Sequence, residues 1–186
     1  MGSGFTAGPE RTLLERSFLR YVVGQFTAPD GEIIERDIVR HAGAVVVVPL
    51  DGDDVVLVRQ YRAALDAELL EVPAGKRDVP GEPSIETAAR ELAEEVGLAA
   101  GVIEPLVTIA TSPGFSDETA ELFLATELSE VPRATEGVEE AHMEIVRMPL
   151  DDAVEAIVRG EIVNAATIVG LLLTAGAVRR RSASGC

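Results

Sequence analysis

The residues best suited to chemistry in this chain are carboxylates gathered in one short segment, residues 82–98. The segment reads EPSIETAARELAEEVGL and holds five glutamates. Glu91 and Glu95 are four residues apart, and Glu91 and Glu94 are three apart. Such spacings put side chains on one face of a helix, with Cβ atoms roughly 5–6 Å apart, where like charges repel. The pattern therefore indicates a site for a divalent cation, which reverses that repulsion, or an ordinary acidic surface helix.

The chemistry that such a site would perform follows from its ligands. Mg²⁺ and Mn²⁺ prefer oxygen ligands and keep bound waters, so two or three carboxylates from one helix suit either ion. An ion of this kind binds a diphosphate, stabilises charge on phosphoryl oxygens and activates a water. Arg90 lies four residues before Glu94, so it can pair with one carboxylate and leave the others for metal.

A helix over Pro83–Glu95 must position these carboxylates. Pro83 suits its first turn and Gly97 suits its end. Its apolar face is predicted to consist of Ile85, Ala89, Leu92 and Val96.

Strands are predicted on both sides of this helix. Asp-Gly turns indicate two hairpins before it, Ser17–Thr27 with Glu32–His41 and Ala44–Leu50 with Val55–Gln60. Further strands are expected at Glu68–Pro73, Val102–Thr111, Glu121–Glu127 and Glu144–Met148, and further helices at Asp151–Val158 and Asn164–Val178. This order predicts an α+β fold with a mixed sheet packed between helices.

The domain organisation expected from these elements has four parts. Residues 1–12 are a flexible N-terminus, 13–41 an N-terminal antiparallel β extension, 42–178 the main domain and 179–186 a flexible basic tail. A length of 186 residues suits this single main domain with an appended element.

Composition restricts the partners. The net charge of −16 argues against nucleic acid as the main partner. No apolar run reaches the roughly 18–20 residues of a membrane span, and no secretory leader is visible, so a cytoplasmic location away from membranes is expected.

The full segment from Gly75 to Leu98 resembles the Nudix box. That pattern is Gly, five residues, Glu, seven residues, then Arg-Glu-apolar-x-Glu-Glu-x-Gly-apolar. From Glu82 onward every specified position matches, but six residues rather than five separate Gly75 from Glu82. The extra residue falls in a Pro-Gly loop, where insertions are well tolerated. The resemblance implies a Nudix-type α/β/α sandwich.

The resemblance also implies roles for residues of the box. Glu91 and Glu95 would be the principal ligands of Mg²⁺ or Mn²⁺, together with the backbone carbonyl of Ala74. Glu94 would be a further ligand or hold a bridging water, and it counts among the catalytic candidates. The residues that would support the box structurally are Gly75, Glu82, Arg90 and Gly97.

Segments outside the box resemble the ADP-ribose pyrophosphatase subfamily over roughly residues 32–170. Thr111–Glu118 reads TSPGFSDE, and its Pro113 lies sixteen residues after Gly97, as is typical of that subfamily. The segments RQYR, LEVPAG and RGEIVN, which begin at Arg59, Leu70 and Arg159, are also similar to it.

Four residues of these segments are candidates for substrate binding: Arg62, Pro113, Gly114 and Phe115. A guanidinium matches phosphate geometry, which favours Arg62, whereas Arg59 is interpreted as a surface charge. The Pro113–Gly114 pair could also be a plain turn. Phe115 could stack on adenine or pack against the protein, and packing is the interpretation we favour.

Hydrolysis also needs a base that orients the attacking water. Glu139 and Glu140, in the acidic loop Glu136–His142, are the candidates, and a purely solvated loop is the alternative. The reaction implied is hydrolysis of ADP-ribose to AMP and ribose 5-phosphate. The alternatives are another nucleoside diphosphate sugar, such as GDP-mannose, or a non-catalytic nucleotide-sensing module, against which the complete set of box glutamates argues. In the subfamily an N-terminal β extension packs across a two-fold axis, which implies a homodimer.

Overall fold

The computed structural model describes residues 4–134 and 141–183. Their contacts divide them into two compact units. The first contains the residues up to Gly43 together with Ala110–Thr119, and the second contains Ala44–Ile109 together with the residues from Ala120 onward. Ala110–Thr119, which the sequence assigns to the main domain, is thus part of the N-terminal unit.

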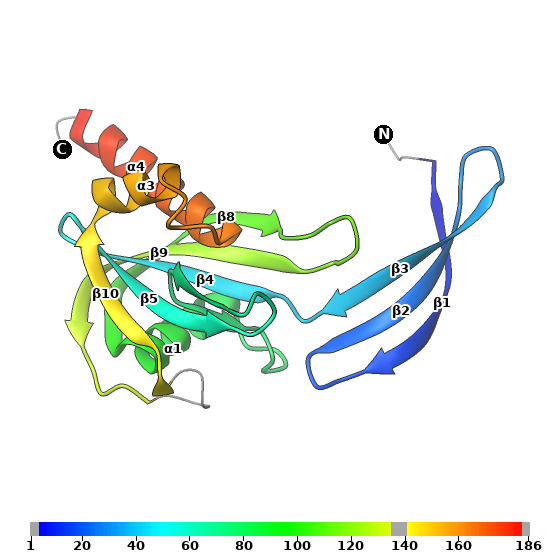
Figure 1. Cartoon of the computed structure of the whole chain (residues 1–186), viewed down its shortest axis with the longest axis horizontal. Helices are drawn as coiled ribbons and strands as arrows, with labels where there is room; N and C mark the ends of the chain where they lie inside the picture. The colour runs from blue at the N-terminus through cyan, green and yellow to red at the C-terminus, as the bar shows by residue number, and fades with distance from the viewer. Residues whose placement is uncertain (1–3, 135–140, 184–186) are drawn as a thin grey trace. The chain divides into compact units, whose positions relative to one another are not determined.

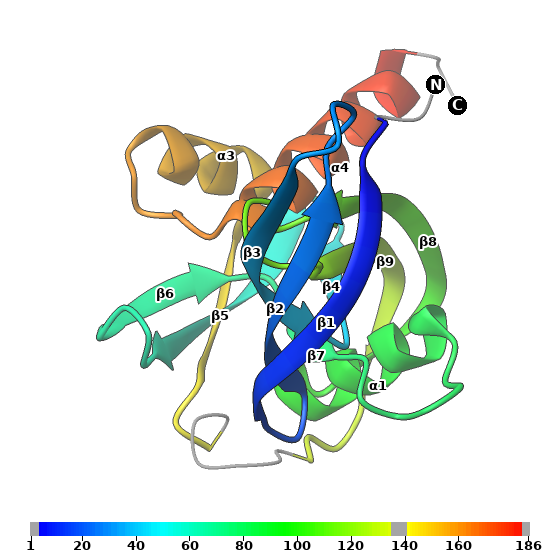
Figure 2. The same ribbon diagram turned by 90° about the vertical axis from the view of Figure 1, so that its right-hand side faces the viewer.

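The first unit is built on an antiparallel sheet of three strands in the order β1-β2-β3, as expected for the N-terminal extension (Figure 2). The strands are β1 (Thr6–Glu15), β2 (Leu19–Thr27) and β3 (Ile33–His41). The turn between β2 and β3 contains Gly31 with φ of 90°, a conformation that glycine adopts at little cost.

The segment Ala110–Thr119 is hydrogen-bonded to β3 at its C-terminal end, and Val39 makes three of these bonds. The Val39 N–H donates to the Phe115 carbonyl at 2.8 Å, and the Val39 carbonyl accepts from the Asp117 N–H at 3.3 Å. The Ser116 hydroxyl donates to the same carbonyl at 2.9 Å. These three bonds fix the Pro-Gly-Phe turn to the sheet of the first unit.

The second unit contains a seven-stranded sheet with the path β10-β5-β4-β9-β8, in which β6 also pairs with β5 and β7 with β4. The strands are β4 (Ala44–Asp51), β5 (Asp54–Arg62), β6 (Ala67–Glu71), β7 (Ala74–Lys76), β8 (Leu98–Ala110), β9 (Thr119–Glu130) and β10 (Glu144–Pro149). The pair β4–β9 is parallel, whereas β4–β5 and β5–β10 are antiparallel. The sheet is therefore mixed, which confirms the expectation.

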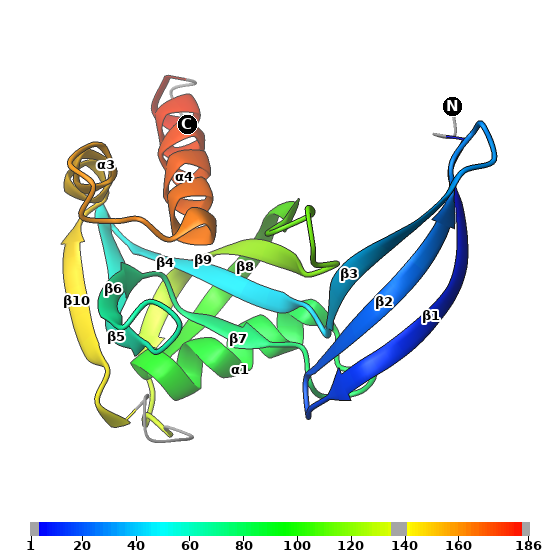
Figure 3. The same ribbon diagram turned by 45° about the vertical axis from the view of Figure 1, so that its right-hand side comes forward.

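Helices cover both faces of this sheet (Figures 1 and 3). On one face α1 (Ser84–Val96) packs over Val45 and Val47; on the other, α3 (Leu150–Val158) and α4 (Ala165–Ala183) pack over Val46 and Val48. Burial on both faces explains why β4 is a continuous run of valines and not an alternating strand. The predicted α/β/α sandwich is thus confirmed. Among the described helices, none is long and apolar enough to span a bilayer.

Two terminal segments expected to be flexible are regular structure instead. Thr6–Glu15 is a strand paired with β2, and its side chains are all exposed. Because neither face of the strand is buried, its sequence does not alternate between apolar and polar residues. The C-terminal helix α4 continues to Ala183, where Arg179 and Arg181 pair with Asp151 and Glu104 at 3.5 and 2.8 Å. Basic residues there also complement the helix dipole.

The helix of the box runs over Ser84–Val96, one residue later at each end than expected, and ends at Gly97, as predicted. The φ of 65° and ψ of 37° at Gly97 are left-handed. Its buried face differs from the predicted one. Ile85 is 44% exposed and Ala89 is exposed, whereas Ala88 and Leu92 are fully buried. The helix is turned so that Glu91 and Glu95 share the inward side with these residues.

Candidate active site

Glu91 and Glu95 lie on the buried side of α1, and only 9% and 4% of their surfaces are exposed. The packing of Leu92, which is fully buried between them in sequence, fixes the rotation of the helix and hence their direction. Carboxylates so far from water are costly unless they are paired or bind a cation. This burial separates the two from the solvated glutamate Glu86 in the first turn of the same helix.

Strand β7 lies directly against these two carboxylates. The Ala74 N–H donates to Glu95 Oε2 at 3.0 Å. A Cβ atom added at Gly75 would overlap the carboxyl group of Glu91. Any larger residue at position 75 would therefore displace Glu91, which is a physical reason for glycine at the start of the box.

Arg90 lies between three carboxylates of the box. Its Nη1 is 3.0 Å from Glu91 Oε1 and 2.7 Å from Glu94 Oε2, and its Nη2 is 3.5 Å from Glu82 Oε2. Burial acts to lower the pKa of the guanidinium, but the hydrogen bond to Glu82 and the attraction of the other two carboxylates outweigh it and raise the pKa. Arg90 is therefore a permanent cation here.

Glu82 joins the loop before α1 to the helix. It accepts a hydrogen bond of 2.7 Å from the Thr87 hydroxyl. This bond, followed by that from Arg90, lowers the pKa of the Glu82 carboxyl below its ordinary value. Glu82 and Arg90 thus cross-link the loop and the helix, which is the kind of contact their expected supporting role requires.

The chemistry of the donors suits a hard divalent cation. Glu91, Glu94 and Glu95 and the Ala74 carbonyl offer only oxygen, the ligand that Mg²⁺ and Mn²⁺ prefer. Within residues 4–134 and 141–183, no three acidic, histidine or cysteine side chains are already gathered around one point as in a formed metal site. Glu91 and Glu94 both contact the Arg90 guanidinium, at 3.0 and 2.7 Å, so an ion would compete with it for them.

Arg62, expected to bind substrate, lies at the end of β5 in a two-pronged ion pair with Glu71. Its Nε and Nη2 donate to the two Glu71 oxygens at 3.0 and 2.6 Å. The Arg62 side chain is 41% exposed, whereas that of Glu71 is 2% exposed. Sequence reasoning missed Glu71, although a carboxylate in the apolar run Leu69–Val72 was a sign that a buried cationic partner exists.

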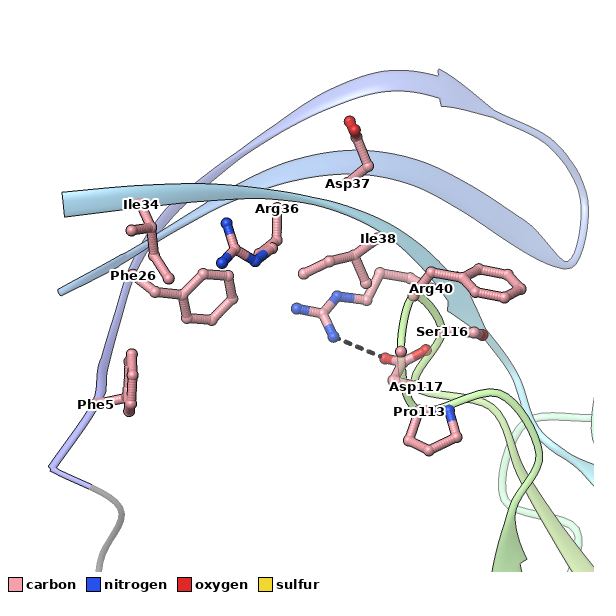
Figure 4. Close-up of a pocket in the computed structure, with 12 residues that line it drawn as sticks. Phe5, Phe26, Ile34, Arg36, Asp37, Ile38, Arg40, Pro113, Ser116 and Asp117 are labelled. Atoms are coloured by element: carbon pink, nitrogen blue, oxygen red, sulfur yellow. Dashed lines mark hydrogen bonds and ion pairs between the residues drawn. The ribbon is translucent and has the colours of Figure 1, made fainter. Parts of the chain in front are cut away.

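Pro113, Gly114 and Phe115 line a pocket of about 380 Å³ in the first unit (Figure 4). The pocket is also lined by Phe5, Phe26, Ile34, Arg36, Asp37, Ile38, Arg40, Ser116 and Asp117. Phe115 is 58% exposed, so the favoured interpretation of this side chain as a packing residue is wrong. Its place on Ser112–Asp117, a turn held to β3, keeps the ring out of any core.

The two arginines of this pocket differ in their partners. Arg40 donates to Asp117 Oδ2 at 3.1 Å and is also paired with Glu10 of β1, so two carboxylates hold it. Arg36 Nη1 donates to the backbone carbonyl of Glu35 at 2.7 Å. Both arginines were missed in sequence, although the alternation Ile34, Arg36, Ile38, Arg40 along β3 puts apolar and basic side chains on one face.

The expected site residues therefore fall into separate groups. The box residues and Arg62 belong to the second unit, whereas Pro113, Gly114 and Phe115 belong to the first. The two candidate bases, Glu139 and Glu140, lie outside the described residues.

Comparison with known proteins identifies the family. The model of the NUDIX domain matches residues 39–166. The chain is 46% identical over 149 residues to "ADP-ribose pyrophosphatase" of Mycobacterium tuberculosis, covering 80% of this chain and 72% of the relative. It is 38% identical over 140 residues to "ADP-ribose pyrophosphatase" of Bacillus subtilis, covering 75% of each chain. It is 32% identical over 173 residues to "GDP-mannose pyrophosphatase" of Cronobacter sakazakii, covering 86% of this chain and 89% of the relative.

A solved structure agrees with the sequence relatives. "Crystal structure of ADP compounds hydrolase" superposes with a TM-score of 0.80 at 24% identity and covers 95% of both chains. That likeness supports the fold. The chain belongs to the NUDIX family and is a hydrolase.

Proposed function

We propose that this protein hydrolyses the diphosphate of nucleoside diphosphate sugars, and of ADP-ribose in particular, in a reaction that depends on Mg²⁺ or Mn²⁺. The observation that carries the proposal is the pair of buried carboxylates, Glu91 and Glu95, held against Ala74 and Gly75 within a matching box. The two relatives named for ADP-ribose favour that substrate. Water adds to one phosphorus, the bridging P–O bond breaks, and AMP and ribose 5-phosphate leave.

Residues of the second unit divide the work in this proposal. Glu91, Glu95 and the Ala74 carbonyl hold the cation, and Glu94 adds a ligand or orients a water. A bound Mg²⁺ or Mn²⁺ supplies positive charge to the phosphoryl oxygens and lowers the pKa of a water. Arg62 presents a guanidinium that Glu71 keeps fixed, a form suited to a phosphate oxygen.

The pocket of the first unit suits the nucleoside in chemical terms. Phe115 and Phe26 offer flat apolar faces to a base, and Arg36 offers a planar cation that can stack on it. A volume of about 380 Å³ is within the range of roughly 300–1,000 Å³ common for ligand pockets. Pro113 and Gly114 shape its rim.

Glu139 or Glu140 is the proposed base that orients the attacking water. The two are adjacent in the sequence, and single substitutions to glutamine distinguish them. Loss of kcat in only one variant, with KM retained, would assign the base. The cytoplasm is the proposed location.

The test is a product-release assay with ADP-ribose, ADP-glucose, NADH, diadenosine polyphosphates and GDP-mannose, each with Mg²⁺ and with Mn²⁺. AMP release from ADP-ribose well above release from the other compounds supports the proposal. Wild-type activity after removal of divalent ions with a chelator contradicts its metal dependence.

A second candidate substrate is a guanosine diphosphate sugar. The relative from Cronobacter sakazakii, which covers 86% of this chain, favours it. GMP release from GDP-mannose at a higher kcat/KM than AMP release from ADP-ribose would decide for this alternative.

We further propose that the protein is a homodimer that associates through the first unit. Its support is the exposure of large apolar side chains on and beside that small sheet: Phe5, Leu13, Leu14 and Ile33 are 46–67% exposed. Surface of this kind is typical of interaction sites. Sedimentation as a monomer with full activity would overturn the proposal.

A further inference from the structure

Glu121 of β9 occupies an unexpected place beside the box. In the sheet, Val45 of β4 pairs with Gly75 of β7 on one side and with Glu121 on the other. Paired residues of adjacent strands direct their side chains to the same face. Val45 packs on the α1 face, so Gly75 and Glu121 also face α1. One row of the sheet thus presents a glycine under Glu91 and a carboxylate two strands away.

Glu121 contacts both ends of the loop that precedes α1. Its Oε1 is 2.9 Å from Arg77 Nη1, directly after β7. The same oxygen accepts a hydrogen bond of 2.7 Å from the hydroxyl of Ser84, the first residue of α1. The side chains of Arg77 and Glu121 are 35% and 30% exposed, so the contact is partly shielded from water.

Within the described residues, the Thr87–Glu82 bond ties the first turn of α1 to the preceding loop, whereas Glu121 ties it to the sheet. Pro83 is the N-cap residue and makes no side-chain capping bond. Ser84 directs its hydroxyl to the sheet and not to the helix backbone. A carboxylate beside a helix N-terminus is also favoured by the helix dipole. Glu121 therefore ties the first turn of the helix to the same row that holds Gly75.

This arrangement also explains how the long loop of the box is accommodated. Six residues separate Gly75 from Glu82, and those from Asp78 to Gly81 are exposed. Arg77 and Ser84 are held on either side of that exposed stretch. The additional residue is thereby confined to the stretch between them, and the contact of Gly75 with Glu91 is unaffected.

We propose that Glu121 is a positioning residue of the active site, which clamps Arg77 and Ser84 and so fixes α1 over Gly75. The proposal rests on the proposed function for its catalytic consequence, but the clamp itself is a property of the fold. Loss of the clamp lets the start of α1 shift. The affinity of Glu91 and Glu95 for the cation then falls.

The test compares Glu121→Ala, Glu121→Gln and Arg77→Met with Glu130→Gln, a control on the exposed end of the same strand. Mn²⁺ affinity is measured by electron paramagnetic resonance, and amide exchange over residues 76–84 by mass spectrometry. Glu121→Ala is expected to weaken Mn²⁺ binding about tenfold, the low end of outer-shell effects, and to speed exchange. The glutamine variant retains an acceptor for Ser84, so its effect is smaller.

Arg77→Met tests the clamp in a variant that is expected to stay folded. Among the described residues, the buried Arg77 Nε has no hydrogen-bond partner, so methionine removes an unsatisfied donor together with the ion pair. This variant is expected to fold and to weaken Mn²⁺ binding as Glu121→Gln does. Because both remove one ion pair, the double variant should be no weaker than either single variant.

The outcomes separate this inference from the proposed function. Wild-type Mn²⁺ affinity or wild-type exchange in Glu121→Ala overturns the clamp. A native protein that hydrolyses none of the nucleotides tested overturns the proposed function, while faster exchange and weaker Mn²⁺ binding in the variant still support the clamp. If the proposed function holds, kcat falls in Glu121→Ala with KM for ADP-ribose unchanged.

Discussion

The box in the second unit and the pocket in the first differ in how far their side chains are buried and in what holds them in place. Glu91 and Glu95 are 9% and 4% exposed, on a helix whose rotation is fixed by fully buried leucine and alanine side chains. In the pocket, Phe5 and Phe115 are 51% and 58% exposed, and the turn that carries Phe115 is held by hydrogen bonds to Val39. Rigid packing orients groups for chemistry, whereas an open, hydrogen-bonded surface can adapt to a ligand. We therefore expect substitutions in the box to change kcat and substitutions in the pocket to change KM.

The largest effect is expected from Glu95→Gln. The amide can still accept the Ala74 N–H, so the fold should be retained, but a neutral group holds a divalent cation poorly. We expect kcat to fall by more than about 100-fold, beyond the range typical of outer-shell partners of a metal. The measurement is AMP release from ADP-ribose, with Glu86→Gln, an exposed change on the same helix, as the control. Turnover at the wild-type rate would contradict the assignment of Glu95 as a ligand of the cation.

Gly75→Ala examines whether the close approach of β7 to α1 is essential. The new Cβ would overlap the Glu91 carboxyl, so we expect a loss of about 10–100-fold in kcat. Overpacking of this kind should lower the free energy of unfolding by about 1–3 kcal/mol. In Gly176→Ala on α4 the new Cβ meets only an ordinary contact, and the helix should gain about 0.5–1 kcal/mol. Denaturant unfolding and steady-state kinetics check both; equal behaviour of the two variants contradicts the argument.

Phe115→Ala addresses the other side of the comparison. Stacking of a base on an aromatic ring contributes about 1–3 kcal/mol, so KM for ADP-ribose should rise by about 5- to 150-fold. The kcat should stay near that of the wild type, because the ring belongs to the pocket and not to the box. Thr27→Ala, an exposed change on β2 outside the pocket and outside the proposed dimer surface, is the control. A fall in kcat with unchanged KM would remove the distinction between the regions.

The smallest effect is expected from acid titration of Glu82 and Glu10. Hydrogen bonds from Thr87 and from Arg40, respectively, lower their pKa values in the folded protein. Each contribution to stability is therefore complete above the unfolded carboxyl pKa of about 4.3 and is lost as pH falls through the folded value.

Glutamine at either position should lower the thermal midpoint at pH 7, and the difference from wild type should shrink below about pH 4. Scanning calorimetry checks this. The protein concentration is kept low, because the chain has little net charge near its pI of about 4.4 and proteins in that state tend to associate. A difference that grows in acid would contradict the pKa directions.

The same contrast explains which features could be predicted from sequence. The helix over Ser84–Val96 and its glutamates follow from local spacing, and the apolar strands from valine runs, because both signals lie within a few consecutive residues. Strand β1 was missed, since its exposed side chains carry no alternation and only pairing with β2 makes it a strand. The pocket was found only in part, because it combines residues near positions 5, 26, 34–40 and 113–117, which only the folded chain brings together.

The bonds at Val39 have a consequence for modularity. The first unit is made from two stretches of chain, and the polypeptide passes between the units at Gly43–Ala44, Ile109–Ala110 and Thr119–Ala120. Cutting the chain at one peptide bond therefore does not separate the whole first unit from the second. A truncation after Gly43 would leave Phe115, Ser116 and Asp117 without their hydrogen-bond partner, and a fragment ending there would lack one wall of its own pocket.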